Sequence, residues 1–340
     1  MKKNRLYVIG NGFDLFHGIE SKYSDFQNYV SAEDDNLYES LEKYFSSDEL
    51  WSDFEGTLAY LDVDTIKDEA EESLVSYSDD DWSDSYHHEY QYIIQRVIDA
   101  VTIDLKKAFT KWILELKIPD TIGDKKLELQ TNARYLTFNY TPTLECLYKI
   151  PSSNILHIHN KAVDINSTLI LGHSRKLKEE REAEEREAEE RELDEADNIN
   201  GNVTIHQNKS ESESDSGDDD NNYDDNEYYQ DDDIDVRVVE GDAILDAYFE
   251  NTYKNTQMVI LEHIDFFFGL KNIEEIYVLG HSLSYVDLRY FQEIVKNINI
   301  NTVQWKVSYY GDRQKEEHQK VLTALGIPQN LILLENMNNF

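Results

Sequence analysis

The sequence has little of what marks exported or membrane-spanning proteins. It holds one cysteine, Cys146, so no disulfide can form within the chain and nothing favours an oxidising compartment. No apolar run approaches the roughly 18 residues of a membrane-spanning helix. The basic start is followed by a short apolar run that Gly10 and Asn11 interrupt, which predicts a first strand and not a signal peptide. We therefore expect a cytoplasmic protein without membrane contact.

Positive charge is also scarce. The formal net charge is −38, from 32 Lys and Arg against 70 Asp and Glu. The segment from Leu177 to Glu240 holds 26 acidic and 6 basic residues, and the remainder still carries about −18. An acidic chain does not offer the extended basic surface that binds nucleic acid along its backbone. We expect no such surface, although a nuclease with a small local site stays open.

The acidic segment divides the chain. Residues 178–191 repeat a five-residue unit of Glu, Arg and Ala, which predicts a solvated, ion-paired helix. Residues 198–235 are rich in Ser, Asp, Glu and Asn, a composition that cannot bury enough apolar surface to fold. We therefore expect residues 1–176 and 241–340 to form two parts of one core. Residues 177–240 are then an insertion, either a tolerated loop expansion or a docking segment.

Short apolar runs that end in polar or glycine turns predict strands. These runs are residues 5–9, 134–138, 155–158, 168–171, 275–279, 302–309 and 331–334. Apolar residues at helical spacing predict helices over 23–61, 90–116, 243–270, 287–297 and 314–325. The alternation in the C-terminal half predicts an α/β fold of Rossmann-like type. We expect a mostly parallel sheet covered by helices, with a helical elaboration after the first strand.

Polar clusters follow several of the predicted strands. They are Gly10-Asn11-Gly12 with Asp14, then Asn139, then His157 and His159, and finally Gly280-His281-Ser282 with Asp287. Ligands of parallel α/β sheets bind outside the carboxyl ends of the strands. The convergence of these clusters at strand ends therefore predicts a binding site.

The first two clusters suit nucleotide binding. Gly10 and Gly12 can bring backbone N–H groups close to a phosphate, although Leu15 stands where the full dinucleotide fingerprint has its last glycine. Asp14 can bind a ribose hydroxyl or serve as a helix cap. Asn139 offers a donor and an acceptor, which can orient a water or hold a ribose, or simply form a turn.

The histidine clusters suggest catalysis. His157 and His159 alternate with apolar neighbours and should point to the same side of the sheet. We favour His159, nearer the strand end, as a base near neutral pH. Ser282 suits a ribose or phosphate, since Ser284 stands where a nucleophile elbow needs glycine. The histidines lack tight ligand spacing, so we predict no metal site.

With these residues the chain resembles the bacteriophage abortive infection AbiH family. The residues that carry the resemblance are 6–14 with His17-Gly18, Tyr23 and Phe26, Trp51 to Glu55, 136–141, 157–159 and 279–283 with Asp287 and Tyr290-Phe291. Asn160 stands where the family's last histidine motif usually has glycine. The resemblance implies an antiviral defence effector and covers nearly the whole chain outside the insertion.

A more distant resemblance is to sirtuin-like domains, including antiviral ones that cleave NAD. The shared features, in the same order, are Gly10 and Gly12, Thr137-Phe138-Asn139, His159-Asn160, and Gly280 to Ser282 with Asp287. Thr141 stands where sirtuin-like proteins have Asp. This resemblance implies NAD as the substrate, with Asn139 placing ribose or water and His159 acting as the base.

Three functions stay open. The first is an abortive-infection effector that binds a nucleotide, NAD by the resemblance, and hydrolyses its N-glycosidic bond. Its catalytic residues would be Asn139 and His159, and its nucleotide-binding residues Gly10, Asn11, Gly12, Asp14, Gly280, Ser282 and Asp287. The second is a nuclease-type effector using Asp14, Glu55, His159 and His281, and the third is a non-catalytic nucleotide sensor. A phage-derived trigger, a partner protein and a homo-oligomer are further partners that the sequence leaves open.

Overall fold

The computed structural model describes residues 4–45, 47–78, 83, 86, 88–123, 125–175 and 235–340. The predictions for the charged repeat at 178–191 and for the acidic segment up to residue 234 fall outside the described residues. None of the helices in the described ranges combines the length and apolar character needed to cross a membrane.

Six parallel strands form one sheet in the order β3-β2-β1-β4-β5-β6. The strands are β1 (Arg5–Ile9), β2 (Arg134–Thr137), β3 (Ile155–His157), β4 (Glu275–Leu279), β5 (Gln304–Tyr309) and β6 (Ile332–Asn336). β1 pairs with both β2 and β4, so the order of connection reverses at β1. This order is that of the doubly wound dinucleotide-binding fold, whose ligands bind where the order reverses. The predicted Rossmann-like α/β fold is confirmed.

Alternate residues of the strands pack against two layers of helices. On one face Leu6, Val8 and their neighbours contact α11 (Thr256–Glu262), α12 (Ile264–Phe268), α13 (Leu288–Lys296) and α14 (Asp312–Ala324). On the other face Tyr7 stacks between Tyr135 and Tyr277, with ring centroids 4.9 Å apart on each side, and α1 (Asn11–Phe16) and α8 (Thr143–Tyr148) lie over them. Both faces are buried, as parallel sheets require.

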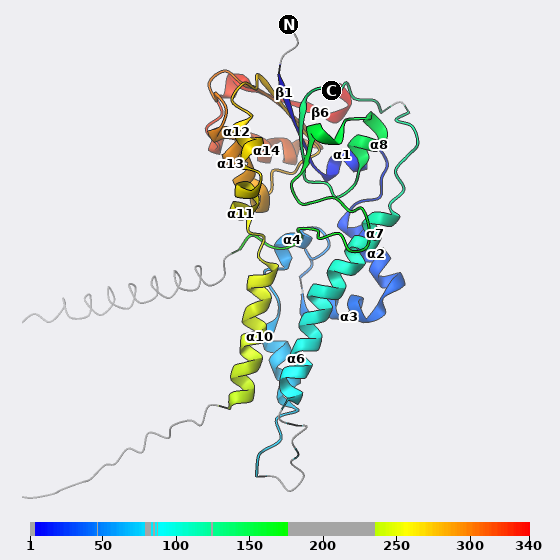
Figure 1. Ribbon diagram of the computed structural model, residues 1–340, viewed down its shortest axis with the longest axis vertical. Helices are drawn as coiled ribbons and strands as arrows, with labels where there is room; N and C mark the ends of the chain where they lie inside the picture. The colour runs from blue at the N-terminus through cyan, green and yellow to red at the C-terminus, as the bar shows by residue number, and fades with distance from the viewer. Residues whose placement is uncertain are drawn as a thin grey trace, which may run out of the picture.

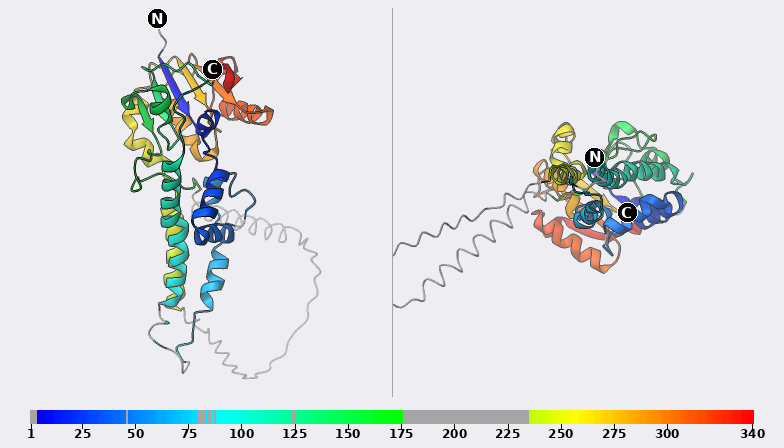
Figure 2. Two further views of the ribbon diagram at one scale, coloured as in Figure 1. Left: turned by 90° about the vertical axis from the view of Figure 1, so that its right-hand side faces the viewer. Right: turned by 90° about the horizontal axis from the view of Figure 1, so that it is seen from below.

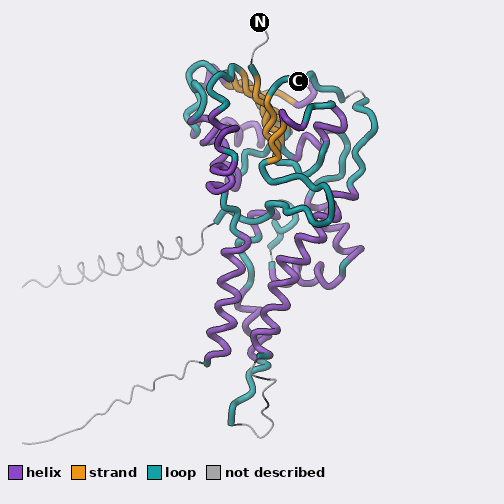
Figure 3. Tube along the Cα trace, in the orientation of Figure 1, coloured by secondary structure: helices purple, strands orange, loops and turns teal. Residues whose placement is uncertain are grey.

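A helical unit with its own apolar core extends from the carboxyl edge of the sheet (Figures 1 and 2). Its helices are α2 (Tyr23–Glu33), α3 (Asp35–Tyr44), α4 (Phe54–Thr57), α5 (Val63–Glu71), α6 (Glu89–Asp99), α7 (Leu105–Glu115) and α10 (Val236–Thr252). A π-helical turn, Ala100–Asp104, joins α6 to α7. The predicted helix over 90–116 is therefore present as one continuous rod. Figure 3 shows loops crossing between the sheet and this unit.

Two predicted elements differ in the structure. Residues 168–171 form no strand, because β3 ends at His157 and leaves no ladder to extend; instead the Ile170 N–H donates to the His159 carbonyl. The helix predicted over 243–270 is three helices, with a first break at residues 253–255 and a second at His263. The first break is stable because the Asn255 side chain caps α11 by accepting from the Met258 N–H.

The second boundary of the insertion also lies earlier than predicted. α10 begins at Val236 and not after Glu240. Arg237 is buried in this first turn, where it pairs with Asp235 at 2.6 Å and donates to the Val75 carbonyl. Residues 236–240 therefore belong to the packed helical unit.

Candidate functional site

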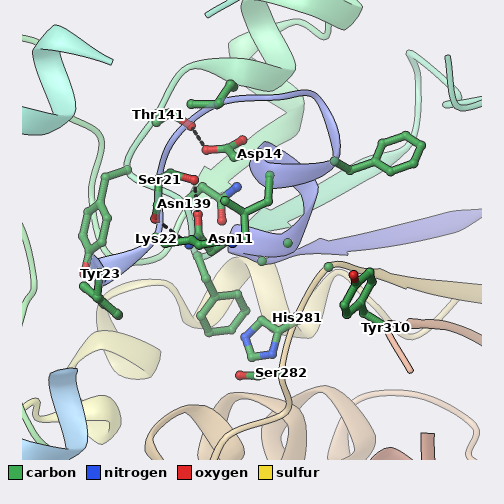
Figure 4. Close-up of a pocket in the computed structure, with 18 of the residues that line it drawn as sticks. Asn11, Asp14, Ser21, Lys22, Tyr23, Asn139, Thr141, His281, Ser282 and Tyr310 are labelled. Atoms are coloured by element: carbon green, nitrogen blue, oxygen red, sulfur yellow. Dashed lines mark hydrogen bonds between the residues drawn. The ribbon is translucent and has the colours of Figure 1, made fainter. Parts of the chain in front are cut away.

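A cavity of about 1100 Å³ lies at the carboxyl ends of β1 and β4, where the strand order reverses. The sheet forms one wall and the helical unit another. All nine residues proposed from the sequence line it: Gly10, Asn11, Gly12, Asp14, Asn139, His159, Gly280, Ser282 and Asp287. Figure 4 shows several of them around the cavity, with Tyr23 and Tyr310 at opposite ends. The loops therefore meet as the sequence predicts; the chemical role of each residue stays a prediction.

The glycines let the β1 and β4 loops touch. The Gly10 N–H donates to the Leu279 carbonyl at 3.0 Å, and the Gly12 N–H donates to the Gly280 carbonyl at 2.7 Å. A Cβ on Gly12 would lie 2.8 Å from the Gly280 Cα atom. Gly280 has a φ of +68°, and a Cβ there would overlap the backbone of Phe13. These two N–H groups thus bond protein carbonyls, and the glycines serve the close approach of the two loops.

Asn11 holds the following loop in place. Its amide donates to the Ser21 carbonyl at 2.7 Å and accepts from the Ser21 hydroxyl at 2.6 Å. Both halves of the amide are therefore bonded to the loop after α1 (Figure 4). The arrangement fixes the rim of the cavity.

Asp14 and Asn139 form a buried polar group beside the glycine loop. Asp14 is 1 % exposed and accepts from the Thr141 hydroxyl at 2.5 Å. Burial raises the pKa of Asp14, and the hydroxyls of Thr141 and Thr143 and the neighbouring Asn139 amide oppose this rise. Asp14 Oδ1 and both amide atoms of Asn139 lack a well-formed hydrogen bond within the described residues. Such buried groups are costly unless something else bonds them.

The two histidines of the β3 region have different surroundings. β3 ends at His157, and a left-handed turn follows at Asn160, with φ +66°. The alternation of side-chain directions along β3 therefore stops before His159. The expectation that the rings of His157 and His159 point to the same side of the sheet does not hold. His157 contacts the Asn139 carbonyl at 3.1 Å and Glu145 at 3.3 Å, and is not among the described residues that line the cavity. His159 does line it.

His159 is a buried, neutral ring. It is 2 % exposed, and its Nε2 lies 3.5 Å from Asp287 Oδ1. Burial lowers its pKa well below the ordinary value, and the Lys254 ammonium lowers it further. The ring therefore keeps a free lone pair at neutral pH and can accept a proton, as a weaker base than an ordinary histidine.

A buried charge cluster joins His159 to the helical unit. We call it the Lys254 cluster; its members are Glu55, His159, Lys254, His281 and Asp287. Lys254 Nζ lies 2.7 Å from Glu55 Oε2 and 3.3 Å from Asp287 Oδ1. Burial alone would lower the pKa of Lys254, but Asp287 and Glu55 together raise it. Burial would raise the pKa of Asp287, but Lys254 and the histidines hold it below its usual range.

Two tyrosines and a backbone turn complete the cluster. The hydroxyls of Tyr23 and Tyr140 lie 3.3 and 3.1 Å from Glu55 Oε1. His281 Nδ1 accepts from the Leu283 N–H at 2.9 Å, and its Nε2 lies 3.5 Å from Asp287 Oδ2. His281 therefore faces Asp287 and not its neighbour Ser282, which gives no support to a nucleophile–base pair.

Sequence reasoning missed Lys254. It follows α10 in an unremarkable Tyr-Lys-Asn segment, and nothing in that segment predicts a buried ammonium. Glu55 stood among the residues of the nuclease alternative, and Tyr23 and Tyr140 lay in segments that carry the family resemblance, without a predicted role. Only the three-dimensional structure shows that Lys254 contacts the carboxylates of the cavity wall.

No group of three or more His, Cys, Asp or Glu is placed to hold a metal ion in the parts of the chain that the structure describes. In the Lys254 cluster, the ammonium lies between the carboxylates of Glu55 and Asp287. The negative charge of this wall is thus balanced in part by a side chain.

Comparison with known proteins gives one result. The model of the family described as bacteriophage abortive infection AbiH matches residues 6–309. No curated protein and no solved structure matches the chain. The matched range contains every cavity residue predicted from the sequence.

Proposed function

The chain belongs to the bacteriophage abortive infection AbiH family and so to abortive-infection defence, and from this premise we propose that it binds NAD and hydrolyses its N-glycosidic bond. Asn139 and His159 are the proposed catalytic residues. Asp14, Ser282 and Asp287 are the proposed contacts to the riboses and phosphates. Gly10, Gly12 and Gly280 shape the nucleotide-binding rim, and Asn11 holds it.

One observation carries the proposal. Four of the buried atoms that lack a well-formed hydrogen bond in the described part of the chain belong to residues that line one cavity, at the point where the strand order reverses: Asp14 Oδ1, both amide atoms of Asn139, and His159 Nε2. This is where dinucleotides bind in doubly wound sheets. The volume, about 1100 Å³, lies just above the usual range for small-molecule sites, which suits a ligand as large as a dinucleotide.

The reaction uses groups that the cavity presents. The bond between ribose C1′ and the nicotinamide nitrogen breaks, and its electron pair stays with the ring, which leaves as neutral nicotinamide. A water attacks C1′, and its proton passes to the neutral His159 ring. The amide of Asn139 orients this water or a ribose hydroxyl, and ionised Asp287 stabilises the positive charge that develops on the ribose. The products are ADP-ribose, nicotinamide and a proton.

The test is release of nicotinamide from NAD by the purified full chain, measured by chromatography. We expect turnover in the wild type and a loss of about 10²- to 10³-fold in Asn139→Ala, because a positioned polar group contributes on this scale. Asn154→Ala is the matched control, since Asn154 is bonded to the Thr131 carbonyl and lies outside the lining residues. Turnover that Asn139→Ala leaves unchanged rejects the proposal.

Two other results would redirect it. Cleavage of RNA or DNA that a chelator abolishes would favour the nuclease-type effector, for which Asp14, Glu55, His159 and His281 line the same cavity. Binding of NAD without any turnover would favour a nucleotide sensor. The acidic composition counts against the nuclease, because a polynucleotide must approach a negatively charged surface.

A further inference from the structure

The negative and positive groups of the Lys254 cluster lie on different sides of it: the carboxylates face the cavity and the ammonium lies behind them. The carboxylates of Glu55 and Asp287 line the cavity. Lys254, whose side chain is 0 % exposed, contacts both carboxylates and is not among the described lining residues. The acidic side of the cluster is therefore turned toward the cavity, with the ammonium behind it.

The histidines are engaged within the cluster. His281 Nδ1 accepts from the Leu283 N–H, and its Nε2 lies 3.5 Å from Asp287 Oδ2. Burial and the nearby Lys254 ammonium hold the pKa of His159 well below its ordinary value. When Glu55 and Asp287 are both ionised, two carboxylates face one ammonium, which leaves one negative charge in excess on this wall. Burial raises the pKa of Glu55, and a cation bound beside it favours its ionised form.

A buried negative charge is stable when a positive partner or several donors meet it. The hydroxyls of Tyr23 and Tyr140 reach Glu55 Oε1, and both tyrosines also line the cavity. Aromatic rings attract cations through their electron-rich faces. The Nε2 atom of His159 lies beside Asp287 without a well-formed hydrogen bond in the described part of the chain. Charge, aromatic lining and an unsatisfied ring nitrogen thus occur on one wall.

We propose that the wall formed by Glu55, Asp287, Tyr23 and Tyr140 is a subsite for a flat, positively charged heteroaromatic ring, such as the pyridinium of an oxidised nicotinamide riboside. This inference rests on the proposed function, the binding of NAD, and adds that the nicotinamide end of the dinucleotide binds at this wall. Lys254 is the positioning residue that holds both carboxylates in place and keeps the excess charge to one.

The subsite also fits the course of the reaction. The pyridinium loses its positive charge as the C1′–N bond breaks, and the ribose gains that charge until water attacks C1′. A fixed carboxylate pair near both groups attracts the cationic substrate and does not hold the neutral nicotinamide that leaves. A neutral nucleoside would gain nothing from the charge of this wall.

The test compares two ligands of nearly the same shape. A carbocyclic NAD analogue resists hydrolysis because its ribose lacks the ring oxygen, and its oxidised and reduced forms differ in the charge of the nicotinamide ring. Calorimetry on the full chain should show at least about tenfold tighter binding of the oxidised form. In Glu55→Gln this preference should fall to within about threefold. Glu145→Gln, which changes a carboxylate outside the lining residues, should keep it.

A second ligand pair separates this inference from the proposed function. 1-Methylnicotinamide, methylated on the ring nitrogen, carries the cationic ring without a nucleotide, and nicotinamide is its neutral counterpart. If neither dinucleotide binds but 1-methylnicotinamide binds more tightly than nicotinamide, the subsite stands and the NAD proposal fails. If the wild type binds both dinucleotides equally well, the subsite is wrong and the NAD proposal stands. If no ligand binds, or if the dinucleotides fail and the small pair shows no preference, both are rejected.

Discussion

Two clusters of acid, lysine and histidine lie on either side of the β3 region and differ in depth. In the Lys254 cluster the ammonium is 2.7 Å from Glu55; in the second, which we call the Glu145 cluster (Glu145, His157 and Lys161), the ammonium is also 2.7 Å from its carboxylate. The Lys254 side chain is 0 % exposed, whereas that of Lys161 is 26 % exposed. The distances match, so the difference between the clusters comes from their surroundings.

The pKa values of Glu145 and Glu55 shift in opposite directions. For Glu145, burial would raise the pKa, but hydrogen bonds from His157 and Lys161 outweigh it and lower the pKa to about 2. For Glu55, burial raises the pKa, and Lys254 reduces this rise without reversing it, while Asp287 adds to it. The Glu145 cluster is an ordinary stabilising ion pair. The Lys254 cluster keeps a carboxylate in a setting that disfavours its charge, which is typical of functional sites.

The largest contrast should appear in catalysis. His159→Asn should reduce nicotinamide release by about 10²- to 10⁴-fold, since a general base contributes on this scale. His157→Asn should change it less than about threefold, because His157 is not among the described lining residues. The measurement is the initial rate of NAD cleavage in both variants. An equal loss of rate in the two variants would contradict the assignment of the base to His159.

The next contrast is in stability. Lys254→Met should lower the free energy of unfolding by about 3–5 kcal/mol, because it leaves two buried carboxylates without their partner. Lys161→Met should cost about 1 kcal/mol or less, since its pair is partly solvated. Urea unfolding followed by circular dichroism measures both. A Lys254→Met variant as stable as Lys161→Met would contradict the burial of the ammonium.

The pH dependence of stability should have opposite signs for Glu145 and for Glu55. The folded pKa of Glu145 is lowered from 4.5 to about 2, so its stabilising contribution is present above pH 4.5 and is lost as the pH falls toward 2. The folded pKa of Glu55 is raised, so its contribution is greatest below its unfolded value and declines as the pH rises through the folded pKa.

Urea midpoints between pH 2.5 and 7 test this contrast. The stability difference between wild type and Glu145→Gln should shrink toward low pH. The difference between wild type and Glu55→Gln should shift against the wild type as the pH rises. Parallel curves for the two variants would refute the assignment.

The smallest effect concerns the tyrosines. Tyr23→Phe removes one of two hydroxyls near Glu55 Oε1 and should cost about 0.5–1.5 kcal/mol of unfolding free energy, the usual net value of one hydrogen bond. Tyr92→Phe, at a side chain 61 % exposed, is the matched control and should be neutral. Thermal unfolding of the two variants gives the comparison, and equal midpoints would show that the Tyr23 hydroxyl adds no net stability.

Local patterns predicted the sheet and the loops of the cavity well. Apolar runs that end in glycine, such as residues 275–279, are strands. A buried parallel strand requires the apolar run, and the tight turn after it requires the glycine, so both features can be recognised in the local sequence. The run at 168–171 has the same mark but forms no strand, since a ladder needs a neighbour and β3 ends too early. Pairing is a property of two segments, and one segment cannot reveal it.

The sequence alone predicted which loops form the rim of the cavity, whereas the buried charges of its wall follow from the tertiary structure. Glycine, asparagine and histidine at strand ends determined which loops would meet, because strand direction brings all carboxyl ends of a parallel sheet to one edge. Only the tertiary structure decided that Lys254 from the break after α10 lies between Glu55 and Asp287, since burial and charge depend on what packs around a side chain. The same packing decided that His159 enters the cavity whereas His157, two residues earlier, bonds to Glu145.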